Sequence, residues 1–160
     1  MIVVSDSSPL IALARVGQLH LLQILFGEVL VPGAVWDEVV QVDRPEVAEI
    51  LSADWVRVVA VADDSYLLAL RTELDRGEAE AISLAADVRA DTLLLDERSA
   101  RQLAVSMGLQ VIGVVGVLKL AKQRGFIPEV RPVLDQLVMV LSFRLGKSLY
   151  DQTLRDAGEL

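Results

Sequence analysis

The chain has 160 residues, of which 53% are hydrophobic and 4% aromatic, and its formal charge is −8. This length suits one domain with a sizeable core, and the acidic balance argues against a protein that coats nucleic acid by neutralising its phosphates. The chain has no cysteine, which excludes disulfides, thiolate zinc sites and cysteine nucleophiles, and its single histidine is His20.

Short β-branched runs alternate with longer helical patterns along the chain. Strands are expected at residues 2–4, 29–31, 56–61, 92–95 and 110–112. Helices are expected from Ser8 to residue 26 with a break at Gly17, then at residues 32–40, 65–74, 78–88, 99–107, 117–124, 130–141 and 149–157. This alternation predicts an α/β fold with a central parallel sheet and right-handed crossovers.

The domain organisation expected from this pattern is a single domain over residues 1–160. Residues 1–125 form its α/β core, and residues 126–160 form a C-terminal helical extension of the same domain. No apolar stretch approaches the roughly 18 residues that cross a membrane, and no signal peptide is recognisable. Together with the lack of cysteine, this leads us to expect a cytoplasmic protein without a membrane partner.

Acidic residues follow two predicted strands and begin two predicted helices. Asp6 comes after Ile-Val-Val-Ser, and Asp96 comes directly after Thr-Leu-Leu-Leu. Glu38 lies early in the helix after the second strand, and Glu78 and Glu80 lie at the start of an alanine-rich helix. Parallel α/β sheets place ligands beyond the carboxyl ends of their strands, so these acids are expected to meet at one rim.

Each acid alone has a simpler explanation as a helix cap, a turn residue or a solvated first-turn glutamate. Their convergence favours a site, because crowded carboxylates repel one another and resist ionisation unless cations hold them. A set of oxygen ligands with no cysteine or histidine nearby suits Mg²⁺ or Mn²⁺ rather than zinc. A phosphoacceptor receiver domain is disfavoured, since it would carry an acidic pair after the first strand, where Asp6 stands alone.

The sequence resembles the PIN-domain family, and within it a PIN-like subfamily of prokaryotic proteins related to VapC toxins. The segments that carry the resemblance are SDSSPLIALARVGQLHLL, VPGAVWDEVV, RGEAEAISLA, LLLDERSAR and GVVGVLKLAKQRG. The third and fourth acids of that family lie just under twenty residues apart. The 18-residue interval between Glu78 and Asp96 therefore favours Glu78 over Glu80 as the third acid.

The resemblance implies a three-layer α/β/α fold and a Mg²⁺- or Mn²⁺-dependent ribonuclease. Its catalytic and metal-binding acids would be Asp6, Glu38, Glu78 and Asp96, and Ser7 would support Asp6 by hydrogen bonding. Glu80 is a further supporting residue. The chain departs from the common toxin pattern in having glutamate at position 78 and a second acid, Glu97, beside the fourth one.

The resemblance also implies partners. The substrate would be single-stranded or looped RNA, a small antitoxin protein would act as inhibitor, and the chain would form a homodimer. Arg98 and Arg101 are candidates for phosphate binding, although the sequence favours the simpler explanation of a solvated helical face paired with Glu97. The alternative function is a catalytically weak or inactive PIN-fold interaction module that dimerises.

Overall fold

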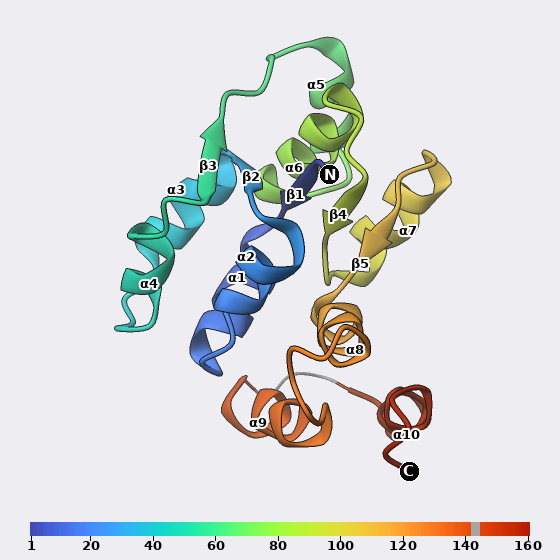
Figure 1. Ribbon diagram of the computed structural model, residues 1–160. Helices are drawn as coiled ribbons and strands as arrows, with labels where there is room; N and C mark the ends of the chain where they lie inside the picture. Colours follow the sequence, from blue (N-terminus) through green and yellow to red (C-terminus); the bar gives the residue numbers. More distant parts are fainter. Residues whose placement is uncertain (142–144) are drawn as a thin grey trace.

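The computed structural model describes residues 1–141 and 145–160 (Figure 1). Its strands are β1 Val3–Ser5, β2 Val29–Pro32, β3 Val56–Val59, β4 Thr92–Leu94 and β5 Val111–Ile112. These strands form one sheet in the order β3-β2-β1-β4-β5, and every neighbouring pair is parallel. The order places β1 at the centre, so the carboxyl ends of β1 and β4 lie side by side.

Helices cover this sheet and give the three-layer α/β/α arrangement that the sequence predicted. They are α1 Ser7–Arg15, α2 His20–Phe26, α3 Gly33–Gln41, α4 Val47–Leu51, α5 Ser65–Arg71, α6 Arg76–Asp87, α7 Arg98–Ser106, α8 Val114–Gln123, α9 Arg131–Leu141 and α10 Lys147–Asp156. Helix α6 packs across β1, β2 and β4 and also contacts α3 and α5. In Figure 1, α3 and α4 lie beside β3, α7 lies beside β5, and α8, α9 and α10 gather at one end of the molecule.

The core explains why the sequence reads as short apolar runs. The strand residues that are completely or almost completely buried are Val3, Val4, Val29, Val31, Leu93 and Leu94. Strands of a parallel sheet are covered on both faces, so they need continuous apolar residues instead of an alternating pattern. No helix in the described parts of the chain is both long and apolar enough to cross a membrane.

Several predicted boundaries are wrong, and local capping chemistry explains the main differences. Helix α6 begins at Arg76, not at residue 78, because Asp75 caps it through a reciprocal capping box with Glu78. The Arg76-Gly77 pair therefore lies inside the helix instead of breaking it. Helix α1 begins directly after Asp6, and α8 begins directly after Gly113. The short helix α4 was not predicted.

The C-terminal helices are tied to the rest of the protein by Glu159. Its carboxylate accepts hydrogen bonds from the backbone N–H groups of Val130 and Arg131, at 2.7 and 2.9 Å, and from the Lys122 ammonium at 2.9 Å. Burial alone would raise the pKa of Glu159, but these donors outweigh it and lower the pKa below its usual value. One side chain thus joins the ends of α8 and α10 to the start of α9.

Replacing Glu159→Gln is expected to lower the free energy of unfolding by about 2 kcal/mol at neutral pH, since charge-assisted hydrogen bonds to three donors are weakened. A lowered pKa stabilises the fold above the ordinary glutamate value, and this stabilisation is lost as pH falls. The difference between Glu159→Gln and wild type should therefore shrink toward acidic pH in urea unfolding experiments. The exposed neighbour Glu129, changed to Gln, is the control and should match wild type at every pH.

Candidate active site

Asp6 and Asp96 lie at the carboxyl ends of two paired strands. Strand β1 pairs with β4 so that Ser5 lies opposite Leu94, and the backbone N–H of Asp6 donates to the Leu94 carbonyl at 3.0 Å. Asp6 follows this pair directly, and Asp96 follows two residues after Leu94. The central strand pairing therefore brings these two acids to one rim, as the sequence predicted.

The Asp6 side chain is buried and poorly compensated. It is 4% exposed, it occupies the N-cap position of α1 without making a side-chain capping bond, and its Oδ1 atom is buried without a hydrogen-bond partner. Burial raises the pKa of Asp6 to about 7, the backbone of Ser7 lowers it in part, and the charges of Glu38, Asp75 and Asp96 raise it further. A buried carboxylate oxygen without a donor is costly, so this atom is poised for an external partner.

Glu38 reaches the same rim from helix α3. The Ser7 hydroxyl donates a hydrogen bond of 2.6 Å to Glu38 Oε2. The Ser7 hydroxyl was expected to support Asp6, and the structure differs: the hydroxyl binds the second acid, and only the Ser7 backbone interacts with the first. The Glu38 carboxylate also lies against Gly77, where a Cβ atom would overlap Glu38 Oε1. Position 77 therefore has to be glycine for Glu38 to occupy this place.

Glu78 reaches the rim from the first turn of α6. Its N–H donates to Asp75 Oδ1 at 2.8 Å, and its Oε1 accepts from the Asp75 N–H at 3.3 Å. Burial raises the pKa of Glu78 to about 8, with a further increase from its interactions with Asp75 and from the charge of Asp6. Of the two glutamates on this helix, Glu78 is the one that joins the other acids.

Asp96 is held by the start of helix α8. Its Oδ1 accepts a hydrogen bond from the Val114 N–H at 3.0 Å, whereas Oδ2 is buried without a partner. A Cβ atom at Gly113 would overlap Oδ1, so glycine at this position makes room for the carboxylate. Burial raises the pKa of Asp96, while the Val114 N–H and the nearby charge of Arg101 lower it in part.

Glu80 has a structural position next to the acids. Its Oε1 accepts from the Ala34 N–H at 3.0 Å, and its Oε2 lies 3.3 Å from Arg71 Nη2 and 3.4 Å from Arg76 Nε. Arg76 also pairs with Asp37 on α3 at 3.6 Å. These contacts join α3, which carries Glu38, to α6, which carries Glu78.

Two further carboxylates, Asp75 and Glu97, belong to this region and were not predicted as site residues. Asp75 raises the pKa values of Asp6 and Glu78. Glu97 caps α7 by accepting from the Ala100 N–H at 2.7 Å, and its carboxylate lies close enough to accept a hydrogen bond from a protonated Glu78. The Asp-x-x-Glu pattern at positions 75–78 is a capping-box signature and could have identified Asp75 from the sequence.

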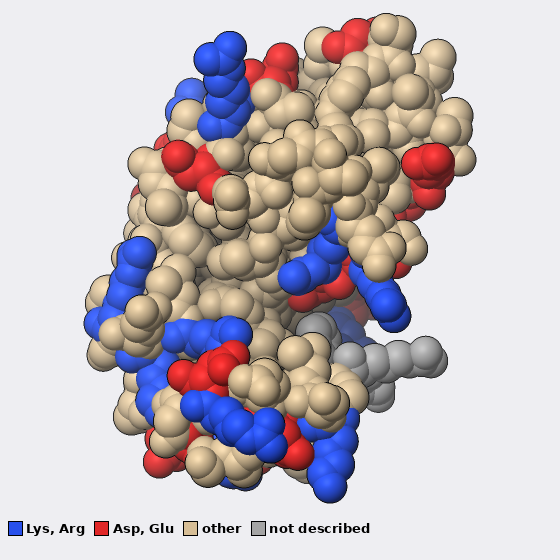
Figure 2. All heavy atoms as spheres, turned by 90° about the vertical axis from the view of Figure 1, so that its right-hand side faces the viewer, with Lys and Arg blue, Asp and Glu red and all other residues tan. Residues whose placement is uncertain are grey.

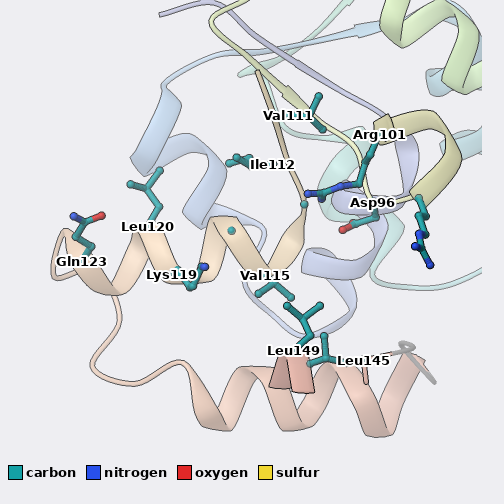
Figure 3. A pocket seen from close by; sticks show the side chains of 13 residues that line it. Asp96, Arg101, Val111, Ile112, Val115, Lys119, Leu120, Gln123, Leu145 and Leu149 are labelled. Carbon is teal, nitrogen blue, oxygen red and sulfur yellow. The ribbon is translucent and has the colours of Figure 1, made fainter. Parts of the chain in front are cut away.

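The two candidate phosphate-binding arginines lie beside Asp96. Arg101 Nη1 donates to the Leu95 carbonyl at 3.2 Å, and its guanidinium points toward Asp96 (Figure 3). Arg98 lines two hollows, of about 690 and 890 Å³, that both reach Asp96. The expected pairing of these arginines with Glu97 is absent: no acid in the described residues lies within salt-bridge distance of either one.

The comparison with known protein families agrees with this geometry. A family model described as the PIN domain matches residues 2–159. The chain belongs to the PIN-domain family. No curated protein matches the chain. PIN domains are in general nucleases that bind divalent metals, so this chain has a nuclease-type fold.

The acids of this PIN domain have the ligand chemistry that a divalent cation needs, but their side chains lie too far apart to hold one in the conformation described. Within residues 1–141 and 145–160, no three acidic or histidine side chains converge closely enough to hold a metal as they stand. The available donors are carboxylate oxygens, which suit Mg²⁺ and Mn²⁺, and two of them are buried without partners. Binding a cation here requires the carboxyl groups to lose protons and turn toward one another.

The raised pKa values predict that the metal-free PIN domain loses stability as pH rises. A carboxyl group with a raised folded-state pKa binds its proton more tightly in the folded state than in the unfolded state. It costs no stability when the pH is below its unfolded-state pKa. The stability loss then grows with pH until the pH exceeds the folded-state pKa. For Asp6 this window runs from 3.8 to about 7.

Asp6→Asn removes this titration. In urea unfolding with EDTA, its stability relative to wild type should increase by about 2 kcal/mol from acidic to mildly alkaline pH. The exposed loop residue Asp43, changed to Asn, should follow the wild-type profile. A stability difference between Asp6→Asn and wild type that is the same at both ends of the window would contradict the burial of an uncompensated Asp6.

Gly77 offers a second test of the geometry. Gly77→Ala forces the Glu38 carboxylate, the movable end of a flexible side chain, away from the Ser7 hydroxyl, and the lost hydrogen bond should cost about 1 kcal/mol of unfolding free energy. At Gly33, in the first turn of α3, a Cβ atom would meet no other atom within 4 Å, so Gly33→Ala should be neutral or slightly stabilising. Equal effects of the two substitutions in urea unfolding would show that Glu38 is not held against Gly77.

Proposed function

We propose that this protein is a metal-dependent ribonuclease of PIN type that hydrolyses phosphodiester bonds in RNA. The observation that carries the proposal is the meeting of Asp6, Glu38, Glu78 and Asp96 at one rim, with buried and unpartnered oxygens on Asp6 and Asp96. Four elements deliver these acids, although the charges of Glu38 and Asp96 raise the pKa of Asp6 and the charge of Asp6 raises that of Glu78. A bound cation would compensate the negative charge of these buried carboxylates.

The four acids are the proposed ligands of Mg²⁺ or Mn²⁺. When bound, such a cation lowers the pKa of a water molecule and stabilises charge on the scissile phosphate. The chain's own residues prepare the site: Ser7 orients Glu38, and the Val114 N–H orients Asp96. Because Asp6 and Glu78 have pKa values of about 7 and 8, cation binding near neutral pH releases protons from them.

Arg98 and Arg101 are the proposed phosphate-binding residues. Both lie next to Asp96 and neither is neutralised by a described acid within salt-bridge distance, so their charge is available to an anionic strand. They supply local positive charge in a chain whose formal charge is −8. The acidic remainder of the surface limits general nucleic-acid binding and confines RNA to this place.

The finer biological assignment rests on the resemblance to VapC-like proteins. We propose that the protein is the toxin of a toxin–antitoxin pair, acts in the cytoplasm on RNA, forms a homodimer and is inhibited by a small antitoxin protein. We also propose that residues 126–160 belong to the same domain as residues 1–125. Contacts of α9 with α1 and of α10 with α8, together with the Glu159 hydrogen bonds, support this.

A second candidate is a PIN-fold interaction module with little or no activity. It is favoured by the apolar residues exposed near the end of α9 and on α10, where Met139 is 82% and Leu149 53% exposed. Unpartnered apolar side chains of this kind are typical of interfaces. The absence of a preformed metal cluster among the described residues also suits this alternative.

Calorimetric titration with Mn²⁺ and an RNA cleavage assay separate the two candidates. Wild type is expected to bind Mn²⁺ and cut single-stranded RNA, and Asp6→Asn and Glu38→Gln should reduce cleavage at least about 100-fold because each removes a proposed ligand. Asp43→Asn is the control, since Asp43 is an exposed acid in the loop that follows α3. Failure of wild type to bind Mn²⁺ would reject the ribonuclease and leave the interaction module.

A further inference from the structure

A hollow of about 690 Å³ lies between α7, β5, α8 and the segment that leads into α10 (Figure 3). Asp96 forms one end of it, so the hollow opens directly onto the acidic rim. Figure 2 views the molecule from this side and shows basic and acidic side chains meeting where the face is hollowed. A volume of this size falls within the roughly 300–1,000 Å³ of sites that hold small organic molecules.

Much of the wall of the hollow is apolar, and the described residues that line it include no aromatic side chain. Its apolar side chains are Val111, Ile112, Val115, Leu120, Leu145 and Leu149. In Figure 3, Leu145 and Leu149 lie opposite Val115, and Val111 and Ile112 form the far side. Several of these residues are partly exposed, so the wall is accessible to a ligand with an apolar body.

Positive charge lies around this apolar wall. Arg98, Arg101 and Lys119 all line the hollow. Lys119 is paired with Asp156 at 3.1 Å, whereas Arg98 and Arg101 have no acid within salt-bridge distance among the residues described. The complementary ligand therefore has an apolar body and an anionic end that lies beside Arg98 and Arg101.

We propose that this hollow receives the base of one unpaired RNA nucleotide next to the scissile phosphate. This rests on the proposed ribonuclease function and deepens it by assigning one nucleotide of the single-stranded substrate to a place on the protein, because a base in a duplex cannot enter a hollow in the protein. The aliphatic wall holds the base, while Arg98 and Arg101 contact the flanking phosphates. The hollow thereby fixes which phosphate lies at the acids.

The test measures binding of a fluorescently labelled single-stranded RNA of about ten nucleotides in Mn²⁺, with RNA integrity checked on a gel. Val115→Trp fills the hollow and should weaken binding about tenfold by excluding the base. Val105→Trp is the matched control, since Val105 is a helical valine that is 60% exposed and does not line the hollow. It should bind RNA as wild type does.

A second pair of variants guards against misfolding of Val115→Trp. Leu149→Glu places a negative charge in the hollow from a position that is already 53% exposed, and it should also weaken RNA binding about tenfold. Met139→Glu, at a position that is 82% exposed and outside the hollow, should have no effect. Thermal unfolding of all four variants verifies that they are folded.

An abasic site moved along the RNA then tests whether a base occupies the hollow. At one position, beside the cleaved bond, removing the base should weaken RNA binding by wild type about tenfold. Removing the same base should not weaken binding by Val115→Trp any further. Equal effects of base removal at every position, or unchanged RNA binding by both Val115→Trp and Leu149→Glu, would overturn the proposal. A change of oligomeric state in these variants with RNA binding intact would mark the hollow as a contact between copies instead.

The outcomes also separate this proposal from the ribonuclease function. RNA cut by Val115→Trp as efficiently as by wild type rejects the base-binding hollow and leaves the ribonuclease. RNA bound with the single-base dependence but never cut supports the hollow and rejects hydrolysis. If wild type binds no RNA at all, both proposals are wrong.

Discussion

The parallel pairing of β1 with β4 determines where the chemistry of this protein lies. The hydrogen bond from the Asp6 N–H to the Leu94 carbonyl lies at the carboxyl end of the β1–β4 pair, where Asp6 and Asp96 follow the two strands. Because both strands are parallel and buried, their carboxyl ends cannot diverge. Helix α3, which follows β2, and helix α6, which precedes β4, bring Glu38 and Glu78 toward the same rim.

This arrangement buries carboxyl groups that are costly to ionise away from water. Asp6, Glu78 and Asp96 all have raised pKa values, and burial is the largest cause for each. The protein offsets part of the cost with local donors: the Val114 N–H for Asp96, the Ser7 hydroxyl for Glu38 and the Asp75 N–H for Glu78. The remaining unpartnered oxygens retain the affinity for a cation or a proton that gives the site its proposed function.

The sequence predicted the order and type of most elements, because strand and helix periodicities differ and the strands are continuously apolar. It also predicted that Asp6 and Asp96 lie at one rim, since position after two paired parallel strands is set by topology, whereas the choice of Glu38 and Glu78 came from the family resemblance. It could not predict that Ser7 binds Glu38, that Glu80 joins α3 to α6, or that a hollow lies beside Asp96. These depend on side-chain directions and on packing between distant segments, which no local pattern encodes. Nor could it predict that Gly77 and Gly113 make room for the carboxylates of Glu38 and Asp96.

The contacts that Glu80 makes between α3 and α6 affect how the acidic rim is lost when the protein unfolds. Glu38 and Glu78 are carried by two helices that one buried carboxylate clamps together through Ala34, Arg71 and Arg76. Their separation is therefore inherited from helix packing in the core and does not depend on a mobile loop. Heat or denaturant should dismantle the acidic rim in the same cooperative step as the sheet, so that the protein has no folded state in which this rim alone is lost.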